Sequence, residues 1–414
     1  MHEIFDVVII GAGPSGSTTA YYLAKEGLNV LLLDKFNFPR DKTCGDGLTP
    51  RALQILEDMG LLDTLLKVGY RSHQLKLIST RGEIASAPFP KRDTTRDYLL
   101  VVPRLILDNI ILERALSSGA SFQAPVRVTG IEHEHNTVLV KGEQGTKAIA
   151  FRTRMVIHAT GANTKLLLTT GFLKKIPQMI LAVRTYYDGI TGILDASQCR
   201  FDNVPLPGYA WIFPVSATSA NVGLGLFHGG LTSRYMPKTA HAAFDTFIQS
   251  QPLQKLLDGS RRISPIKGFP IRVDFARSPT YGERTMIIGE AAGLVNPITG
   301  EGIDYGLESG KLAAEHLSHM FASGDFSHKR LAAFDKQLRL RYQRLFVLCD
   351  RLRLLYLNPF FVNLVVRAVA RDEKLMNIFM NIAVENQNLS QGFAPNVIAK
   401  VLLEGMPYRK RIPE

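Results

Sequence analysis

Two short segments near the amino terminus hold residues whose types and spacing can support chemistry. The first, GAGPSG, places Gly11, Gly13 and Gly16 directly after an apolar run and before a segment with helical spacing of apolar residues. Glycines at these positions let a pyrophosphate approach the backbone. The second, FPRDKTCGDGLTP, places Cys44 between a cation and two glycines. A thiol in such a loop is either a reactive group or a small residue that fits a tight turn.

The elements around the three glycines form a βαβ unit. The apolar runs VVII and VLLL are typical of buried parallel strands, and the segment between them is typical of a helix. In this context Gly11 permits the tight turn, Gly13 leaves room for the pyrophosphate, and Gly16 lets the helix pack closely on the strand. Asp34 ends the second strand and can accept hydrogen bonds from ribose hydroxyls. The unit predicts a dinucleotide site without distinguishing NAD from FAD.

A second glycine-rich segment lies late in the chain, from Arg284 to Leu317. An apolar strand, MIIG, is followed there by a loop and then by a helix. Glu290, just past the strand, can bind sugar-like hydroxyls. The loop from Pro297 to Gly302 can present backbone N–H groups and a helix amino end to a carbonyl that gains negative charge. This arrangement suits a flavin, and a glycine-rich turn between core elements is the alternative.

Two weaker signals lie between these segments. A predicted helix from Val101 to Ala120 carries Arg104 near its start, and the short strand in MVIHATGAN ends in a turn of small residues at Gly161. Each signal alone would be interpreted as a surface charge or an ordinary turn. Their value lies in their order and spacing relative to the two glycine-rich segments.

Taken together, the four pieces resemble the FAD-dependent oxidoreductases of the p-hydroxybenzoate hydroxylase superfamily and, within it, the geranylgeranyl reductase family. The most specific matches are FPRDKTCGDGLTPRAL, PLPGYAWIFP and NPITGEGIDYGLESGKLAAE. The resemblance covers the chain from Phe5 to about Glu315. The strings LPGYAWIFP and GEGIDYGLESGKLAAE look especially like the bacterial reductases that saturate the isoprenoid tail of menaquinone.

The resemblance implies that FAD is the cofactor, with Arg104 near its ribityl-phosphate region. Glu290 stands where most members carry Asp, so a carboxylate for the ribityl chain remains. Thr160 and Gly161 stand where the hydroxylases carry Asp-Gly, a departure that argues against hydroxylase-style NADPH binding. The candidate FAD-binding residues are Gly11, Gly13, Gly16 and Asp34 for the ADP half, together with Arg40, Cys44, Gly45, Arg104, Gly161, Glu290, Pro297, Gly300, Gly302 and Ile303.

The resemblance also places the CGDG segment beside the isoalloxazine ring. Hydride transfer from a flavin to an isolated carbon–carbon double bond requires a proton from another group, and Cys44 is the candidate catalytic donor. Nearby Lys42 would by itself favour the thiolate and oppose this role. The alternative is that Cys44 is a small residue that fits the loop.

An aromatic segment is the candidate substrate-binding element. In PLPGYAWIFP, Tyr209, Trp211 and Phe213 alternate along a predicted strand and therefore share one face. They form either a wall suited to an apolar chain or a sheet face packed on a core.

The predicted fold class is α/β: a Rossmann-like FAD-binding domain with an inserted antiparallel β-sheet substrate domain and a helical carboxy-terminal region. The FAD-binding domain is expected to combine residues 1–70, 100–170 and 280–325, and the substrate domain residues 71–99 and 171–279. The helical region covers residues 326–414.

The composition limits the compartment. Three cysteines, Cys44, Cys199 and Cys349, favour a reducing compartment, and they supply neither a disulfide framework nor a zinc-ligand cluster, so no metal is expected. The first residues lack the pattern of a secretion signal, and no stretch reaches the roughly 18 uninterrupted apolar residues of a membrane-spanning helix. We therefore expect a cytoplasmic protein that does not span a membrane.

The net charge of +12 is concentrated toward the carboxy end. Between Lys329 and Arg371, ten Lys or Arg stand against Asp335 and Asp350, with apolar runs between them. Such a stretch either lies against anionic lipid or forms the solvated face of helices over a core. A membrane-dissolved substrate would favour peripheral membrane association. The chain contains no recognisable nucleic-acid-binding motif, so we expect no nucleic-acid partner.

The function implied by the resemblance is FAD-dependent reduction of double bonds in a polyprenyl lipid such as menaquinone or a geranylgeranyl compound. The electron donor is left open between NAD(P)H and ferredoxin. One rival is a flavin monooxygenase or halogenase, because YAWIFP looks like the WxWxIP stretch of flavin halogenases, with Lys76 as the nearby candidate for their catalytic lysine. The other is a non-catalytic lipid-binding protein on a vestigial flavin fold.

Overall fold

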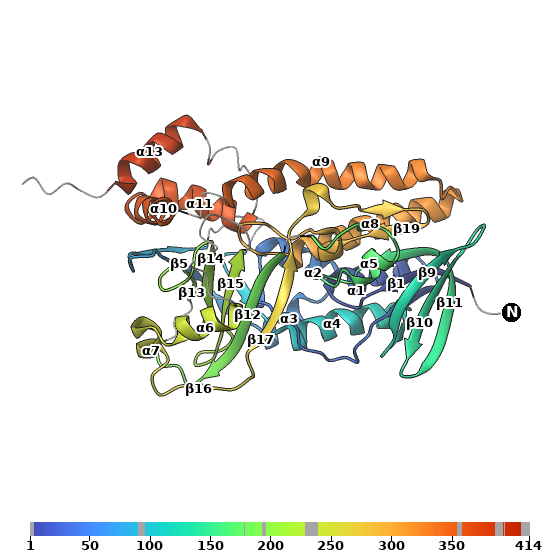
Figure 1. Ribbon diagram of the computed structural model, residues 1–414, viewed down its shortest axis with the longest axis horizontal. Helices are drawn as coiled ribbons and strands as arrows, with labels where there is room; N and C mark the ends of the chain where they lie inside the picture. Colours follow the sequence, from blue (N-terminus) through green and yellow to red (C-terminus); the bar gives the residue numbers. More distant parts are fainter. Residues whose placement is uncertain are drawn as a thin grey trace, which may run out of the picture.

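The computed structural model describes residues 4–89, 96–177, 179–192, 196–227, 239–353, 358–385, 392 and 394–406. Within them the chain forms two sheets of eight strands and one of three. Figure 1 shows the first large sheet near the amino terminus, the second toward the opposite end, and long carboxy-terminal helices along one side. The predicted α/β fold with a second sheet and a helical carboxy-terminal region is confirmed.

The first large sheet is assembled from segments far apart in the sequence. Its strands are β1 (Ile4–Ile10), β2 (Val30–Leu33), β8 (Ser121–Gln123), β9 (Arg127–His133), β10 (Val138–Gln144), β11 (Lys147–His158), β18 (Tyr281–Gly282) and β19 (Thr285–Ile287). β1 lies between β2 and β11 and pairs in parallel with both, and β19 continues the parallel row beside β11. Because β9 and β10 form an antiparallel layer against one face and helices cover the other, the apolar runs of β1 and β2 are buried.

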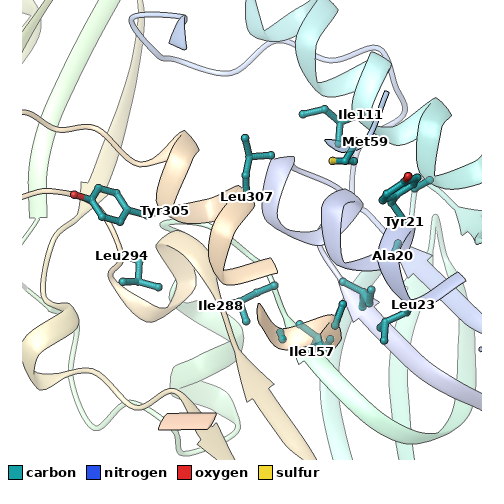
Figure 2. Close-up of a cluster of buried hydrophobic side chains, with 14 of the residues drawn as sticks. Ala20, Tyr21, Leu23, Met59, Ile111, Ile157, Ile288, Leu294, Tyr305 and Leu307 are labelled. Atoms are coloured by element: carbon teal, nitrogen blue, oxygen red, sulfur yellow. The ribbon is translucent and has the colours of Figure 1, made fainter. Parts of the chain in front are cut away.

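Three helices cover the helical face of this sheet: α1 (Pro14–Lys25), α4 (Arg104–Ser117) and α8 (Ile303–Ser323). Figure 2 shows the shared core, with Ala20 and Leu23 of α1 close to Ile157 of β11. Glycine allows α1 and α8 to approach, because a Cβ at Gly310 would lie 2.7 Å from the carbonyl oxygen of Ser15. The glycine-rich segment late in the sequence therefore fixes α8 against the βαβ unit.

The second large sheet consists of β5 (Gln74–Ile78), β6 (Ile84–Pro88), β12 (Met179–Asp188), β13 (Ala196–Arg200), β14 (Gly208–Pro214), β15 (Ala220–Phe227), β16 (Arg261–Arg262) and β17 (Lys267–Arg272). Its pairings are antiparallel except that β5, which comes from an earlier part of the chain, runs parallel to β13. Helix α6 (Ala240–Ile248) packs on β12 and β15, and α7 (Gln251–Leu256) follows it.

Short elements connect the two large sheets. β3 (Gly47–Leu48), β4 (Tyr70–Ser72) and β7 (Leu99–Val101) form the three-stranded sheet, and β3 begins at the last residue of the CGDG segment. The remaining short elements are α2 (Pro50–Asp58), α3 (Leu62–Val68), α5 (Lys165–Thr169), η2 (Phe275–Arg277) and η3 (Gly289–Ala292). The predicted domain boundaries remain predictions.

The carboxy-terminal helices are α9 (His328–Arg353), α10 (Pro359–Arg371), α11 (Glu373–Glu385) and α13 (Pro395–Gly405). α9 runs along α8 and contacts η2 and β18, whereas α10 packs on β6 and on α13 (Figure 1). None of the helices in the described part of the chain combines the length and apolar character needed to cross a bilayer.

Candidate active site

A cavity of about 1080 Å³ lies between the two large sheets. Its size is at the upper end of the about 300–1,000 Å³ typical of ligand pockets, which leaves room for a dinucleotide and part of a substrate. We call the part lined by the βαβ unit and the loop before α8 the nucleotide arm, and the part lined by the second large sheet the apolar arm. The predicted residues that line the cavity are Gly11, Gly13, Asp34, Arg40, Cys44, Gly45, Arg104, Gly161, Glu290, Gly300, Gly302, Ile303, Tyr209, Trp211 and Phe213.

The glycine-rich turn shows which of its glycines the fold itself requires. Gly11 has a φ of +111°, and a Cβ there would lie 2.3 Å from the carbonyl oxygen of Ala159. Gly16 does not line the cavity; a Cβ there would lie 1.9 Å from the carbonyl oxygen of Gly11. A Cβ on Gly13 would meet only Arg40, at 3.4 Å. Gly13 is thus the glycine whose missing side chain leaves space on the cavity side.

Two helices present their amino ends to the cavity. α1 begins at Pro14 after Gly13, and α8 begins at Ile303 after Gly302, and no described side chain caps either end. All four residues line the cavity. Uncapped N–H groups with a positive helix dipole suit a pyrophosphate at one end and a carbonyl that gains negative charge at the other. Pro297, which precedes α8, is buried outside the lining.

Asp34 braces the glycine-rich turn from the end of β2. One carboxylate oxygen accepts a hydrogen bond from the backbone N–H of Ala12 at 2.9 Å, and the other accepts one from Phe36 at 2.9 Å. Each oxygen keeps a further lone pair for a ribose hydroxyl. The donor set and the glycine cradle therefore fit the ADP half of FAD.

Glu290 lines the cavity and forms an ion pair that the sequence did not predict. Its carboxylate contacts the Lys42 ammonium at 2.7 Å and accepts a hydrogen bond from the Arg272 N–H at 3.3 Å. A Cβ on Gly161 would lie 3.3 Å from this carboxylate. The Lys42 charge is thus balanced by Glu290, which answers the objection that it would ionise Cys44.

The cation beside Cys44 is Arg104. Its guanidinium is buried and forms two hydrogen bonds with Asp108, at 2.6 and 2.8 Å, and Arg40 pairs with the same carboxylate at 2.9 Å. Burial raises the pKa of the Cys44 thiol, the nearby Asp46 carboxylate raises it further, and Arg104 only partly opposes both. The thiol is therefore held protonated at neutral pH, the state that a proton donor requires.

A hydrogen-bond network fixes the CGDG loop against the second large sheet. The Asn221 amide donates to the Cys44 carbonyl and to the Asp46 carboxylate, each at 2.7 Å. The Trp211 indole N–H donates to the Asn221 oxygen at 2.9 Å, and the Tyr186 hydroxyl donates to Asp46 at 2.5 Å. Sequence reasoning missed Asp46, Tyr186 and Asn221, although an acid between two glycines beside the thiol was a visible signal.

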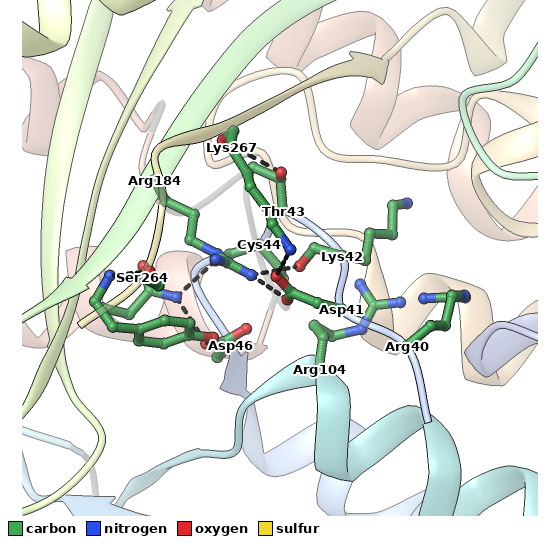
Figure 3. A network of polar contacts seen from close by, with 12 residues as sticks. Arg40, Asp41, Lys42, Thr43, Cys44, Asp46, Arg104, Arg184, Ser264 and Lys267 are labelled. Carbon is green, nitrogen blue, oxygen red and sulfur yellow. Dashed lines mark hydrogen bonds and ion pairs between the residues drawn. The ribbon is translucent and has the colours of Figure 1, made fainter. Parts of the chain in front are cut away.

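Charged residues hold the start of this loop. Arg184 of β12 is fully buried and bonds to the Asp41 carboxylate and to the Lys42 carbonyl, and Lys267 reaches Asp41 at 2.8 Å. Figure 3 shows the loop between Arg184 on one side and Arg104 on the other. The loop is positioned by contacts from distant parts of the chain.

The aromatic residues of β14 line the apolar arm. Trp211 lies over β15, where a Cβ on Gly223 would be 2.1 Å from its ring, and Phe213 approaches Gly45. The Tyr209 hydroxyl donates to the Thr299 carbonyl in the loop before α8. The wall continues with Leu75, Leu77, Phe89, Phe201, Phe227 and Phe379. Lys76 does not line the cavity.

Comparisons with known proteins agree with this geometry. A family described as an FAD binding domain matches residues 5–180. A menaquinone reductase of Mycobacterium tuberculosis is 34% identical over 394 residues, which covers 91% of this chain and 90% of that protein. Digeranylgeranylglycerophospholipid reductase 1 of Methanopyrus kandleri is 30% identical over 356 residues, 83% of this chain and 87% of that protein.

Solved structures share the fold. A geranylgeranyl bacteriochlorophyll reductase-like protein from Thermoplasma acidophilum has a TM-score of 0.80 at 22% identity, covering 95% of this chain and 99% of that one. The flavin-dependent brominase Bmp2 has a TM-score of 0.67 at 22% identity, covering 94% and 100%. FAD is the cofactor, the protein is an oxidoreductase, and the chain belongs to the geranylgeranyl reductase family of FAD-dependent oxidoreductases.

Proposed function

We propose that this protein reduces carbon–carbon double bonds in the isoprenoid chain of a lipid such as menaquinone or a geranylgeranyl compound. The observation that carries the proposal is one cavity lined by the dinucleotide cradle, by the aromatic residues of β14 and by Cys44, whose neighbour Gly45 lies against Phe213. Relatives named for reduction of menaquinone and of a digeranylgeranyl lipid support it. Bound FAD supplies the hydride.

The chain's own residues would divide the remaining work. Gly13, Asp34 and the amino end of α1 would hold the pyrophosphate and ribose, and Glu290 the ribityl chain. Tyr209, Trp211 and Phe213 would line the isoprenoid chain and exclude water from it. The role of each residue is part of the proposal.

Cys44 would donate the proton to the second alkene carbon. It lines the cavity, it is half-buried, and its pKa is raised by burial, so its proton is present at neutral pH. The S–H bond breaks as the carbon–hydrogen bond forms, and the thiolate that remains is stabilised by Arg104.

The lipid would enter from a membrane surface at the end of the molecule that carries α10 and α13. Phe360 on α10 and Leu402 and Leu403 on α13 are exposed apolar residues, and Phe379 on the neighbouring α11 lines the apolar arm. Exposed cations of the stretch from Lys329 to Arg371, such as Arg351 and Arg371, add attraction to anionic lipid, whereas Arg339, Arg341 and Arg367 are paired with carboxylates of the chain. Flotation with anionic vesicles, compared with neutral vesicles, tests this peripheral association.

The function is tested anaerobically. Protein reduced with dithionite is mixed with detergent-dispersed menaquinone or geranylgeranyl lipid, and flavin absorbance is followed with mass analysis of the lipid. Dithionite and reduced flavin also reduce the quinone head group, so the lipid is weighed after air has reoxidised that group. A gain of two mass units per reduced double bond is then expected. A flavin that stays reduced until air enters contradicts the proposal and favours oxygen chemistry. Each double bond consumes two electrons, so the same assay with NADPH, NADH or ferredoxin replacing dithionite identifies the electron donor.

A further inference from the structure

The Asp46 carboxyl is a buried acid that the proposed reaction has not used. Asp46 is fully buried and has a φ of +67° in the CGDG loop. One oxygen of the Asp46 carboxylate accepts two hydrogen bonds, from the Tyr186 hydroxyl at 2.5 Å and from the Asn221 amide at 2.7 Å. The other oxygen has no partner among the described residues. Asp46 lines the same cavity as Cys44, two residues along the same loop.

The charged groups around Asp46 are committed to other partners. From β12, Arg184 bonds to Asp41, and from α4, Arg104 bonds to Asp108 in a bidentate pair. Asp46 is therefore a buried carboxyl held by neutral donors, with no ion pair of its own among the described residues. Burial without a paired cation disfavours the ionised form and raises the pKa of Asp46 to about 6. Its proton is thus exchangeable near neutral pH.

Asp46 is also coupled to Cys44. The Asp46 backbone N–H donates to the Cys44 sulfur, and the ionised Asp46 side chain raises the pKa of the thiol. Asn221 donates to both residues and fixes their relative position. A charge change on either group is therefore felt by the other.

We propose that Asp46 stores the proton that restores the Cys44 thiol after each reduction. The inference rests on the proposed function. After Cys44 has given its proton to the alkene carbon, the Asp46 O–H bond breaks, the S–H bond re-forms, and the carboxylate left behind takes a proton from water. No electrons move in this step. The transfer is downhill, because the thiol is the weaker acid of the two.

The first test uses the flavin-loaded, oxidised protein without lipid. Alkylation of Cys44 by iodoacetamide is measured against pH by peptide mass analysis in wild type and in Asp46→Asn. The variant removes the carboxylate charge and keeps an amide of similar shape for Tyr186 and Asn221. We expect the Cys44 profile to move to lower pH and alkylation at pH 8 to rise about tenfold, as for a pKa shift of about one unit. An unchanged profile would overturn the coupling.

The second test compares the first turnover with steady-state lipid reduction. The first turnover uses a thiol already protonated, so Asp46→Asn should raise the ratio of first-turnover to steady-state rate at least about tenfold. An equal loss in both rates would indicate a merely structural role and overturn the proposal. If the lipid is not reduced at all, the proposed function fails while the alkylation result still decides the coupling.

Tyr186→Phe keeps the proposal testable if Asp46→Asn does not fold. The Tyr186 hydrogen bond lowers the pKa of Asp46, so removing it should raise that pKa. The Asp46 carboxyl is protonated below its pKa and loses its proton as pH rises through that pKa. Steady-state turnover in wild type should therefore fall as pH rises above about 6, and the fall should move to higher pH in Tyr186→Phe. If the fall in turnover of Tyr186→Phe occurs at the same pH as in wild type, or at lower pH, the proposal is contradicted.

Discussion

The two arms of the cavity use glycine for different reasons. In the turn that supports the nucleotide arm, Cβ atoms at Gly11 and Gly16 would overlap backbone oxygens at 2.3 and 1.9 Å. Behind the wall of the apolar arm, a Cβ at Gly223 would overlap the Trp211 ring at 2.1 Å. The first arm depends on how closely backbone segments approach, and the second on how a side chain packs. Backbone approach leaves a fixed local motif, whereas side-chain packing between strands can be satisfied in many ways.

The largest effect is expected from Gly16→Ala. The added methyl group would overlap the carbonyl oxygen of Gly11, so α1 must move away from β1. We expect the free energy of unfolding to fall by about 3 kcal/mol and FAD to be lost. Urea denaturation measures the free energy of unfolding, and the flavin-to-protein absorbance ratio measures bound FAD. The control is Gly27→Ala. Gly27 has a φ of +81°, and no described atom lies within 4 Å of a Cβ placed there. This substitution should lower the free energy of unfolding by only about 1–2 kcal/mol. Equal effects of the two would refute the close-approach explanation.

Gly13→Val should separate cofactor binding from folding. Among the described residues its Cβ would meet only Arg40, so the fold should remain, while the side chain would enter the space assigned to the pyrophosphate. We expect the Kd for FAD to rise on the order of 100-fold, or about 2.8 kcal/mol, with little change in Tm of the flavin-free protein. A variant that keeps stoichiometric flavin would show that the pyrophosphate lies elsewhere.

Cys44→Ala should affect turnover and spare the cofactor. Loss of a general acid slows reactions by on the order of 100-fold, and we expect that loss in anaerobic lipid reduction with FAD still bound. Cys199→Ala is the control, because Cys199 also lines the cavity but lies on β13. Full activity of Cys44→Ala would leave Cys44 as a small residue fitted to its loop.

Gly223→Ala should give the smallest effect and report on the packing of Trp211 in the wall of the apolar arm. The methyl group would displace the Trp211 ring, so we expect the KM for the lipid to rise about tenfold while flavin remains bound, a cost of about 1.4 kcal/mol. Trp211 is the only tryptophan, so its fluorescence follows the displacement directly. In Gly225→Ala the new Cβ lies at ordinary contact distance, 3.8 Å from Ile180, and both signals should stay as in wild type. Similar shifts in both variants would contradict side-chain displacement.

The prediction was most complete where function depends on the backbone. The βαβ unit, the strand before Glu290 and the helix after Gly302 were all located from apolar runs and glycine spacing, because these patterns are local. FAD as cofactor and the family were implied by the resemblance that the motifs of these segments carry, and both are confirmed. The sequence also indicated that Tyr209, Trp211 and Phe213 share a face, since alternation along a strand is local as well.

Other features were decided only by the tertiary structure. The Lys42–Glu290 ion pair joins residues 248 positions apart, and Asp46 meets Tyr186 and Asn221 across 140 and 175 positions. No local pattern encodes such contacts, because they depend on how the second large sheet sits on the CGDG loop. The protonation of Cys44 is likewise set by burial and by the balance of Arg104 against Asp46. The sequence by itself determined the cofactor cradle and the presence of a thiol beside it, and the folded chain decided the charge state in which that thiol is held.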